Sequence, residues 1–251
     1  MSFDSKIKAK TLVAIPVFNE REFIDPLLRA VRRYSANILV VDDGSADGTS
    51  QALRKHKYLY SITHQDNKGY GRSIIDAINF AHKNRFPWLI TLDCDYQHEP
   101  SYIPDFYAEL QKDDADIISG SRYLRPLNSD PVPPPKDRVA INKKITSLLN
   151  RALGLELTDS FCGFKAFRTD SVFKLALNEQ GYGFPLQLWI RAARASLKIR
   201  EIPVPLIYYD PRRNFAGCLK NPKKRFNYYM KIIQKELKMD VCKNLEKTFN
   251  P

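Results

Sequence analysis

Trp88-Leu89-Ile90-Thr91-Leu92-Asp93-Cys94-Asp95-Tyr96-Gln97 joins a short apolar run directly to an acidic cluster. The apolar run predicts a buried strand, and side chains two apart on a strand face the same way. Asp93, Asp95 and Gln97 are therefore expected on one face. Two carboxylates and an amide oxygen suit a hard divalent cation such as Mg²⁺ or Mn²⁺. The alternative, more common for an isolated D-x-D pair, is that one aspartate caps the next helix while the other is solvated.

Strand-like and helix-like segments alternate over about the first 120 residues, which sets the fold class. Further buried or short strands are predicted at residues 11–17, 38–41, 60–62 and 116–119. Strands that alternate with helices predict an α/β fold, in which a mostly parallel sheet carries helices on both faces. Ligands bind such sheets at the carboxyl ends of the strands. Both Asp42-Asp43 and the Asp93/Asp95 pair are expected there, which favours a site over two chance caps.

The composition is that of a soluble globular protein with a basic charge balance. The chain has 251 residues, 43% of them hydrophobic, and a formal net charge of +12. This length fits one large domain, and the charge favours anionic partners. No aromatic-basic RNA motif appears, so we expect no nucleic acid. The polar first ten residues contain no signal-peptide core, and no apolar run approaches the ~18 residues of a membrane span. A cytoplasmic protein is expected.

The second half of the chain departs from the strand–helix alternation. Residues 125–137 contain five prolines and no periodicity, which predicts a long exposed loop of the kind that often forms a lid or a binding segment. Apolar residues then recur at helical spacing from 141 to 152, and Gly154 is placed to end that helix. A second helix near 184–195 is expected to lead into two short strands around 199–209.

The C-terminal tail predicts one more helix. Asn221-Pro222 suits a helix cap and first turn. The apolar stripe of this helix consists of Phe226, Tyr229, Met230, Ile233 and Leu237. Basic residues accompany it at Lys223, Lys224, Arg225, Lys231 and Lys235. Either the stripe packs on the rest of the domain, or the helix lies on an anionic membrane, where each basic residue adds roughly 1 kcal/mol.

Six short motifs stand in a fixed order along the chain. They are Val13-Ala14-Ile15-Pro16-Val17-Phe18-Asn19-Glu20, Val40-Val41-Asp42-Asp43-Gly44-Ser45, Asp93-x-Asp95-x-Gln97-His98-x-Pro100, Gly120-Ser121-Arg122-Tyr123, Asp159-Ser160-Phe161-Cys162-Gly163-Phe164 and Glu201-Ile202-Pro203-Val204. Together they resemble the family 2 inverting glycosyltransferases, which have the GT-A fold, and within them the dolichol- or polyprenyl-phosphate mannosyltransferases (glucosyltransferases). The resemblance runs from about residue 11 to 209. It implies one glycosyltransferase domain with a nucleotide-sugar half at 10–122, an acceptor half at 123–210 and a helical tail at 221–251.

The resemblance implies that donor binding falls to six residues, which are Pro16, Phe18, Glu20, Asp42, Asp43 and Lys68. The first three match the loop that holds the base and ribose. Asp43 matches the second-strand carboxylate that reads the nucleoside, with Asp42 beside it, and the lysine lies at the start of a predicted helix near the donor. Asp93, Asp95 and Gln97 match the metal and diphosphate site. The implied cofactor is Mg²⁺ or Mn²⁺, and the implied donor is a GDP- or UDP-linked hexose.

At the acceptor end the resemblance implies a set of arginines. Arg122 and Arg138 match basic residues that hold the acceptor phosphate. Either Arg212 or Arg213 matches an arginine that reaches the donor and acceptor phosphates, because the sequence that follows them is shifted. Catalytic roles are therefore expected for Asp95, Arg122, Arg138 and Arg213.

The expected chemistry follows from the charge that develops on the leaving group. A nucleoside diphosphate gains negative charge as it leaves, and a metal with an arginine would neutralise it. A hydroxyl acceptor needs a general base, whereas a phosphate acceptor is already ionised. Gln187, on the helix where many relatives that act on hydroxyls carry a carboxylate, cannot act as a base, and His98 is more readily explained as shaping a turn. Gln187 in this position favours a phosphate acceptor.

A polyprenyl phosphate, met at the inner face of a membrane by a peripheral enzyme, is therefore the preferred acceptor. A soluble hydroxyl compound or a growing glycan is the alternative within the same enzyme class. An alternative from another class is a catalytically silent protein that binds nucleotide sugars. The intact Asp93/Asp95 pair argues against the silent alternative.

Overall fold

The computed structural model describes residues 3–95, 97–125, 133–207 and 217–237. Its centre is a seven-stranded sheet in the order β3-β2-β1-β4-β6-β5-β7. The strands are β1 (Thr11–Val17), β2 (Ile38–Asp42), β3 (Tyr60–Thr63), β4 (Trp88–Thr91), β5 (Ile117–Ser121), β6 (Lys165–Arg168) and β7 (Ile199–Pro203). Strand β6 runs antiparallel to both of its neighbours, and the other neighbouring strands are parallel. The predicted α/β fold with a mostly parallel sheet is confirmed.

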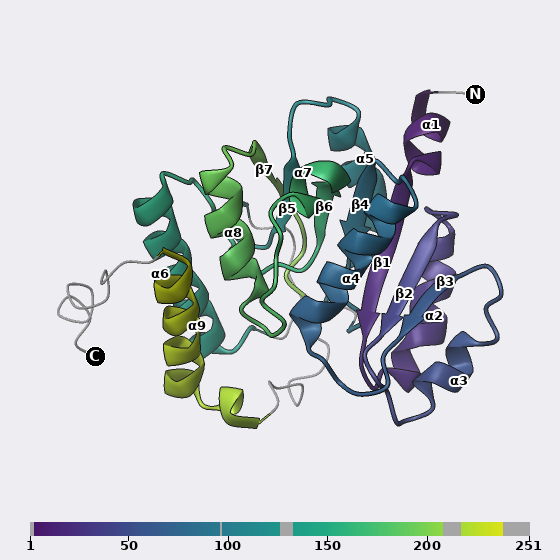
Figure 1. Cartoon of the computed structure of the whole chain (residues 1–251), viewed down its shortest axis with the longest axis horizontal. Coiled ribbons are helices and arrows are strands. Elements are labelled where there is room, and N and C mark those ends of the chain that lie inside the picture. Colours follow the sequence, from purple (N-terminus) through teal and green to yellow (C-terminus); the bar gives the residue numbers. More distant parts are fainter. Residues whose placement is uncertain (1–2, 96, 126–132, 208–216, 238–251) are drawn as a thin grey trace.

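Helices cover both faces of this sheet (Figure 1). The α-helices are α1 (Phe3–Ala9), α2 (Arg21–Arg32), α3 (Thr49–Leu53), α4 (Tyr70–Lys83), α5 (Ile103–Leu110), α6 (Lys136–Leu153), α7 (Thr169–Phe173), α8 (Phe184–Arg194) and α9 (Pro222–Leu237). Two short 3₁₀ segments, Pro100–Tyr102 and Gly217–Lys220, precede α5 and α9. The short helices α1 and α7 were not predicted, because five to seven residues are too few to show a helical period.

The two layers of the core follow from the alternation of side chains along each strand. In β1, Leu12 and Ala14 pack in the core layer that includes α4, α6, α8 and α9. Val13 and Ile15 point the other way, into the layer formed with α2 and α5. Both layers are closed off from solvent, so strands such as β1 and β2 are apolar throughout rather than alternating.

Strand β6 is the main element that the sequence did not predict. It has only four residues, two of them basic, and pairs with β4 and β5, each of which lies far from it in the sequence. Of the two strands expected around 199–209, one forms, Ile199–Pro203. Residues 204–207 add no strand, and residues 208–209 lie outside the described residues. Pro205 lacks the N–H group that a ladder requires.

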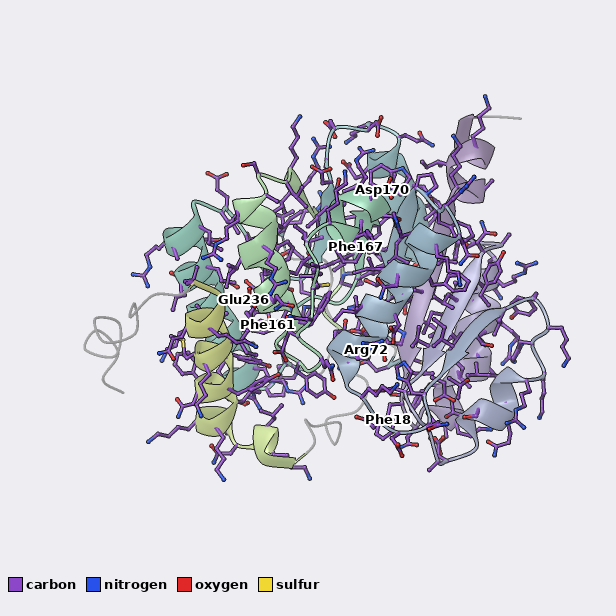
Figure 2. All side chains as sticks on the ribbon, viewed as in Figure 1. Phe18, Arg72, Phe161, Phe167, Asp170 and Glu236 are labelled. Carbon is purple, nitrogen blue, oxygen red and sulfur yellow. The ribbon has the colours of Figure 1, made fainter. Side chains whose placement is uncertain are left out.

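The predicted tail helix forms as α9 and packs on the domain. Its side chains Tyr229, Ile232 and Ile233 are buried in the same core layer as α8. The buried Glu236 accepts a hydrogen bond from Gln187 Nε2 at 2.6 Å. It also forms an ion pair with Arg191, whose Nε lies 2.9 Å from the carboxylate. Figure 2 shows Glu236 on α9, on the side of the helix nearest α8. Of the two interpretations of the apolar stripe, packing on the domain is therefore confirmed. In the described part of the chain no helix is both long and apolar enough to span a bilayer.

Candidate active site

A cavity of about 860 Å³ opens at the carboxyl ends of the parallel strands. Its lining includes nine of the residues predicted for the site, which are Pro16, Phe18, Glu20, Asp43, Asp93, Asp95, Gln97, Arg122 and Arg138. Of the other four, Asp42 and Lys68 do not line it, and Arg212 and Arg213 lie outside the described residues. Figure 2 shows Phe18 at the lower edge of the molecule, where β1 ends, and Arg72 at the nearby start of α4. The structure therefore brings most of the predicted site into one cavity.

Asp43 is fixed in place by the segment that starts α4. Its two carboxylate oxygens accept the N–H groups of Lys68 and Gly69, each at 2.8 Å. His64 Nδ1 lies 2.6 Å from Asp43 Oδ1, and His64 Nε2 lies 2.9 Å from Asp76 Oδ2. Both ring nitrogens of His64 therefore face carboxylate oxygens, and the ring links Asp43 to Asp76 on α4. Asp43 thus enters the cavity as a rigid hydrogen-bond acceptor.

Asp42 and Lys68 form hydrogen bonds within the loops beside the cavity and do not line the cavity itself. Asp42 is fully buried, and its carboxylate accepts hydrogen bonds from the Ser45 N–H and the Ser50 hydroxyl. Lys68 contributes its backbone N–H to Asp43, while its side chain is exposed. Both residues shape the surroundings of Asp43, and neither side chain reaches the cavity wall.

Asp93 has a carboxylate oxygen that is not satisfied by a hydrogen bond within the described residues. Its side chain is 29% exposed, yet Oδ1 is buried and has no hydrogen-bond partner among the described residues. Burial raises the pKa of Asp93, against a hydrogen bond from the Tyr70 hydroxyl and the charges of Lys165 and Arg122. A buried carboxylate oxygen without a donor suits a cation.

The neighbours of Asp93 complete a set of oxygen-bearing groups. Asp95 Oδ1 accepts the Gln97 N–H at 3.0 Å, so Asp95 is oriented by the turn that follows β4. No group of three His, Cys, Asp or Glu side chains in the described part of the chain could hold a metal by itself. A cation here would rest on Asp93, Asp95 and the Gln97 amide, with substrate phosphates supplying further ligands, which is typical of Mg²⁺.

His98 shapes the turn, as the sequence suggested. It is buried, and its Nδ1 accepts the Asp93 N–H at 3.0 Å. Burial lowers the pKa of His98 to about 4, so the ring is neutral near pH 7. The expected position of Gln187 beside the acceptor needs a correction, because its side chain is buried away from the cavity. It binds the N–H groups of Asn178 and Glu179, each at 2.7 Å.

Arg122 is held by a buried carboxylate. Its Nε and Nη2 donate to the two oxygens of Asp159 at 2.6 and 3.0 Å. Asp159 is fully buried and also accepts from Asn142 Nδ2 at 2.7 Å. The charge of Asp159 raises the pKa of Arg122 although burial opposes this, so the guanidinium stays charged. Arg122 contributes a fixed and partly neutralised positive charge to the cavity wall.

The cavity also has lining residues that the sequence did not single out. The most prominent are Tyr70, Asn142, Tyr182, Arg225 and Tyr229. Tyr70 and Tyr182 stack with ring centroids 6.1 Å apart, although they are 112 positions apart in the sequence (182 minus 70). Arg225 and Tyr229 are four apart on α9, so they share a helix face. A basic residue directly before the apolar stripe, one turn before Tyr229, was the available signal for Arg225.

Gly163 provides a test of the Asp93 geometry that leaves the fold in place. A Cβ atom at Gly163 would lie 2.3 Å from Asp93 Oδ2, so Gly163→Ala must displace that carboxylate. We expect activity to fall by roughly 10- to 100-fold, because misplacing a reacting group by about 1 Å has effects of this size. The measurements are kcat and a urea unfolding curve.

Gly154→Ala is the matched control for Gly163→Ala. Gly154 has a φ of 67°, and a Cβ atom at this position would meet no other atom within 4 Å. The substitution should lower stability by about 1 kcal/mol through backbone strain and leave kcat unchanged. Unchanged kcat in Gly163→Ala would contradict the placement of Asp93 at the reaction centre.

Together, the α/β sheet and the acidic cavity at its carboxyl ends agree with the GT-A-like fold that the six motifs predicted. Residues 12–175 match the family model described as Glycosyl transferase family 2, and the chain belongs to that family. It is therefore a family 2 glycosyltransferase, as the six motifs predicted.

Two curated relatives and one solved structure illustrate the family. The undecaprenyl-phosphate mannosyltransferase of Micrococcus luteus is 28% identical over 207 residues, covering 79% of this chain and 84% of that protein. The UDP-N-acetylglucosamine–dolichyl-phosphate N-acetylglucosaminyltransferase of Methanococcus voltae is 27% identical, covering 78% and 85%. Glucosyl-3-phosphoglycerate synthase of Mycobacterium tuberculosis, solved with Mn²⁺, UDP-glucose and phosphoglyceric acid, superposes with a TM-score of 0.68. It is 14% identical and covers 94% of this chain and 84% of that one. This structural likeness confirms the fold.

Proposed function

We propose that this protein transfers a hexose from a GDP- or UDP-linked donor to a polyprenyl-phosphate-type acceptor, with inversion at the anomeric carbon. The observation that carries the proposal is the order of groups along one cavity. Asp43 follows β2, the Asp93/Asp95 pair follows β4, and Arg122 follows β5. In the sheet order, the strand of the acidic pair lies between the other two. Along the cavity, a nucleoside site at Asp43 is therefore followed by a diphosphate site at Asp93 and Asp95, and then by a cationic site at Arg122.

The donor end would hold the nucleoside through fixed groups. Phe18 is 45% exposed, and with Pro16 it offers an apolar surface to the base. Asp43 offers carboxylate oxygens whose direction is set by the Lys68 and Gly69 N–H groups. Asp93, Asp95 and Gln97 would hold Mg²⁺ or Mn²⁺, which when bound neutralises charge on the leaving diphosphate. Use of Mn²⁺ by the structurally similar synthase supports this choice.

The acceptor end suits a nucleophile that is already an anion. One acceptor phosphate oxygen forms the new bond to the anomeric carbon, and the bond to the diphosphate breaks, with its electron pair leaving on the diphosphate. No proton has to move. Burial lowers the pKa of His98 to about 4, which makes its ring a weak base, and its Nδ1 already accepts the Asp93 N–H. Gln187 lies outside the cavity, so we assign neither residue as a base. Arg122 and Arg138 would attract and orient the phosphate. Polyprenyl-phosphate acceptors in the names of both curated relatives support the same assignment.

The outer surface of α9 is compatible with work at a membrane. Lys223, Lys224, Lys231 and Lys235 are exposed, while Tyr229, Ile233 and Leu237 of the apolar stripe are buried and Phe226 and Met230 are half-buried. We propose that these lysines provide a peripheral contact with anionic lipids at the inner face of the membrane, where a polyprenyl phosphate would be presented. Such contacts add roughly 1 kcal/mol per basic residue.

A donor and acceptor matrix tests the proposed function. GDP-mannose, UDP-glucose and UDP-N-acetylglucosamine are each offered with a polyprenyl phosphate or the matching polyprenol, in anionic or neutral vesicles. We expect transfer from at least one donor to the phosphate and not to the alcohol, abolished by EDTA, restored by Mn²⁺ and faster on anionic vesicles. Equal transfer to the polyprenol would contradict the phosphate acceptor. Full activity in EDTA would contradict the proposed metal requirement. Equal rates on anionic and neutral vesicles would contradict the proposed peripheral contact with anionic lipids.

A further inference from the structure

Helix α9 places a buried arginine against the cavity. Arg225 is 3% exposed and lines the cavity together with Arg138 and Tyr229. It lies outside residues 12–175, which match the family model, so the match assigns it no role. Its Nη1 donates to the Leu219 carbonyl at 2.9 Å, and its Nη2 forms an ion pair with Asp137. The tail thus contributes a cation to the same wall as α6.

The partner of Arg225 is the more exposed member of the pair. The Asp137 side chain is 39% exposed, whereas that of Arg225 is 4% exposed. Removing water from a guanidinium is costly unless an anion compensates for it. A half-exposed carboxylate keeps much of its hydration within the pair, so it returns to water at a lower cost than a fully buried one and can be exchanged for another anion on Arg225. The buried guanidinium of Arg225 therefore requires an anionic partner, and the Asp137 carboxylate is a partner that can dissociate and be hydrated again.

A phosphate monoester is well matched to this position. A guanidinium presents donors in a planar fork that fits phosphate oxygens, and charge-assisted bonds of this type are about twice as strong as neutral ones. Arg138 is the residue next to Asp137 and lines the same cavity. Helices α6 and α9 pack together, so the two arginines approach the cavity from neighbouring elements. Arg122 is paired with the fully buried Asp159, whereas the partner of Arg225 is a half-exposed carboxylate that solvent can reach.

We propose that Arg225 binds the phosphate of the acceptor and that the Asp137 carboxylate pairs with Arg225 until the acceptor binds. The acceptor phosphate then exchanges with the Asp137 carboxylate on the Arg225 guanidinium. This inference rests on the proposed function in so far as the acceptor is a phosphate monoester. It adds a residue from the tail helix to acceptor recognition and makes Asp137 an internal competitor of the substrate.

Three substitutions test the exchange through separate Michaelis constants. Arg225→Gln should raise KM for the polyprenyl phosphate by roughly 30-fold, since it removes a charge-assisted contact, and leave KM for the donor unchanged. Arg225→Lys should recover part of the loss. Asp137→Asn should lower the acceptor KM by about 3- to 10-fold, because the competitor loses its charge. Arg151→Gln, at an exposed position of α6 outside the cavity lining, is the matched control and should change neither constant.

A second measurement separates this inference from the proposed function. Binding of farnesyl phosphate, without donor, is measured by calorimetry on the wild type and the same variants. If the wild type glycosylates a polyprenyl phosphate while Arg225→Gln keeps the same acceptor KM and farnesyl phosphate affinity, the inference is wrong and the function stands. If no polyprenyl phosphate is glycosylated, farnesyl phosphate affinity that falls in Arg225→Gln and rises in Asp137→Asn still supports the inference.

The remaining outcomes also decide between exchange and a purely structural ion pair. A rise in donor KM with an unchanged acceptor KM would place Arg225 at the diphosphate and overturn the proposal. If Arg225→Gln does not fold, Asp137→Asn carries the test, because Arg225 then keeps its charge. An acceptor KM and farnesyl phosphate affinity unchanged in Asp137→Asn would show that the ion pair is only structural.

Discussion

Asp95→Asn is expected to lower kcat by about 10³-fold while leaving the fold intact. The asparagine keeps the Oδ1 atom that accepts the Gln97 N–H at 3.0 Å, so the turn after β4 should persist. What is lost is a negative charge beside Asp93, whose Oδ1 already lacks a donor among the described residues. A cation held by one carboxylate instead of two would stabilise the departing diphosphate much less, and losses of this size follow when charge stabilisation in a transition state is removed.

Two measurements check the Asp95 prediction. The first is kcat with saturating donor and Mn²⁺, and the second is Mn²⁺ binding in the presence of the nucleoside diphosphate, followed by electron paramagnetic resonance. Asp105→Asn, on the exposed face of α5, is the matched control and should change neither. If Asp95→Asn transfers sugar at the wild-type rate, with and without chelator, the metal role of this pair is wrong.

The sequence predicted the donor half well because its signals are local. Each parallel strand is a short apolar run, and each acidic group follows its run directly, so strand ends and site residues were found together. The resemblance assigned the nucleoside to Asp43 with Asp42 beside it, and the local pattern alone does not separate the two. Their separation depends on the alternation along β2, where Val40 packs in the α2 layer and Val41 in the α4 layer. If the same alternation continues past Val41, Asp42 lies on the α2 side of the sheet, next to the loop that follows β2, and Asp43 lies on the α4 side.

The acceptor half was harder to predict because its contacts join distant segments. Arg225 reaches Asp137 only because α9 packs on α6. Gln187 was placed on the correct helix but given the wrong environment. Residues 184–190 of α8 are all buried, so the helix has no polar face from which the direction of Gln187 could be inferred. Its true partners, Asn178 and Glu236, lie on a loop and on the tail.

Asp159→Asn is expected to have the largest effect on stability, about 3–5 kcal/mol in the free energy of unfolding. Asp159 is fully buried and pairs through both oxygens with Arg122, whose side chain is only 12% exposed. Neutralising one member of a buried pair leaves the other as an uncompensated charge, which is the costly case. Urea unfolding gives the free energy. Asp113→Asn, which removes a 72% exposed partner of Arg168, is the control and should have little effect.

The pH dependence of this loss identifies the ion pair as its cause. Burial alone would raise the pKa of Asp159, but the charge and hydrogen bonds of Arg122 outweigh burial and hold it well below its ordinary value of 3.8. A carboxylate whose pKa is lowered by folding stabilises the folded state above its unfolded pKa and loses that contribution as pH falls toward its folded pKa. The difference between wild type and Asp159→Asn should therefore be constant from about pH 5 to 8 and shrink below about pH 4. A difference that stays the same down to about pH 3 would mean that altered packing, and not the lost charge, destabilises the variant.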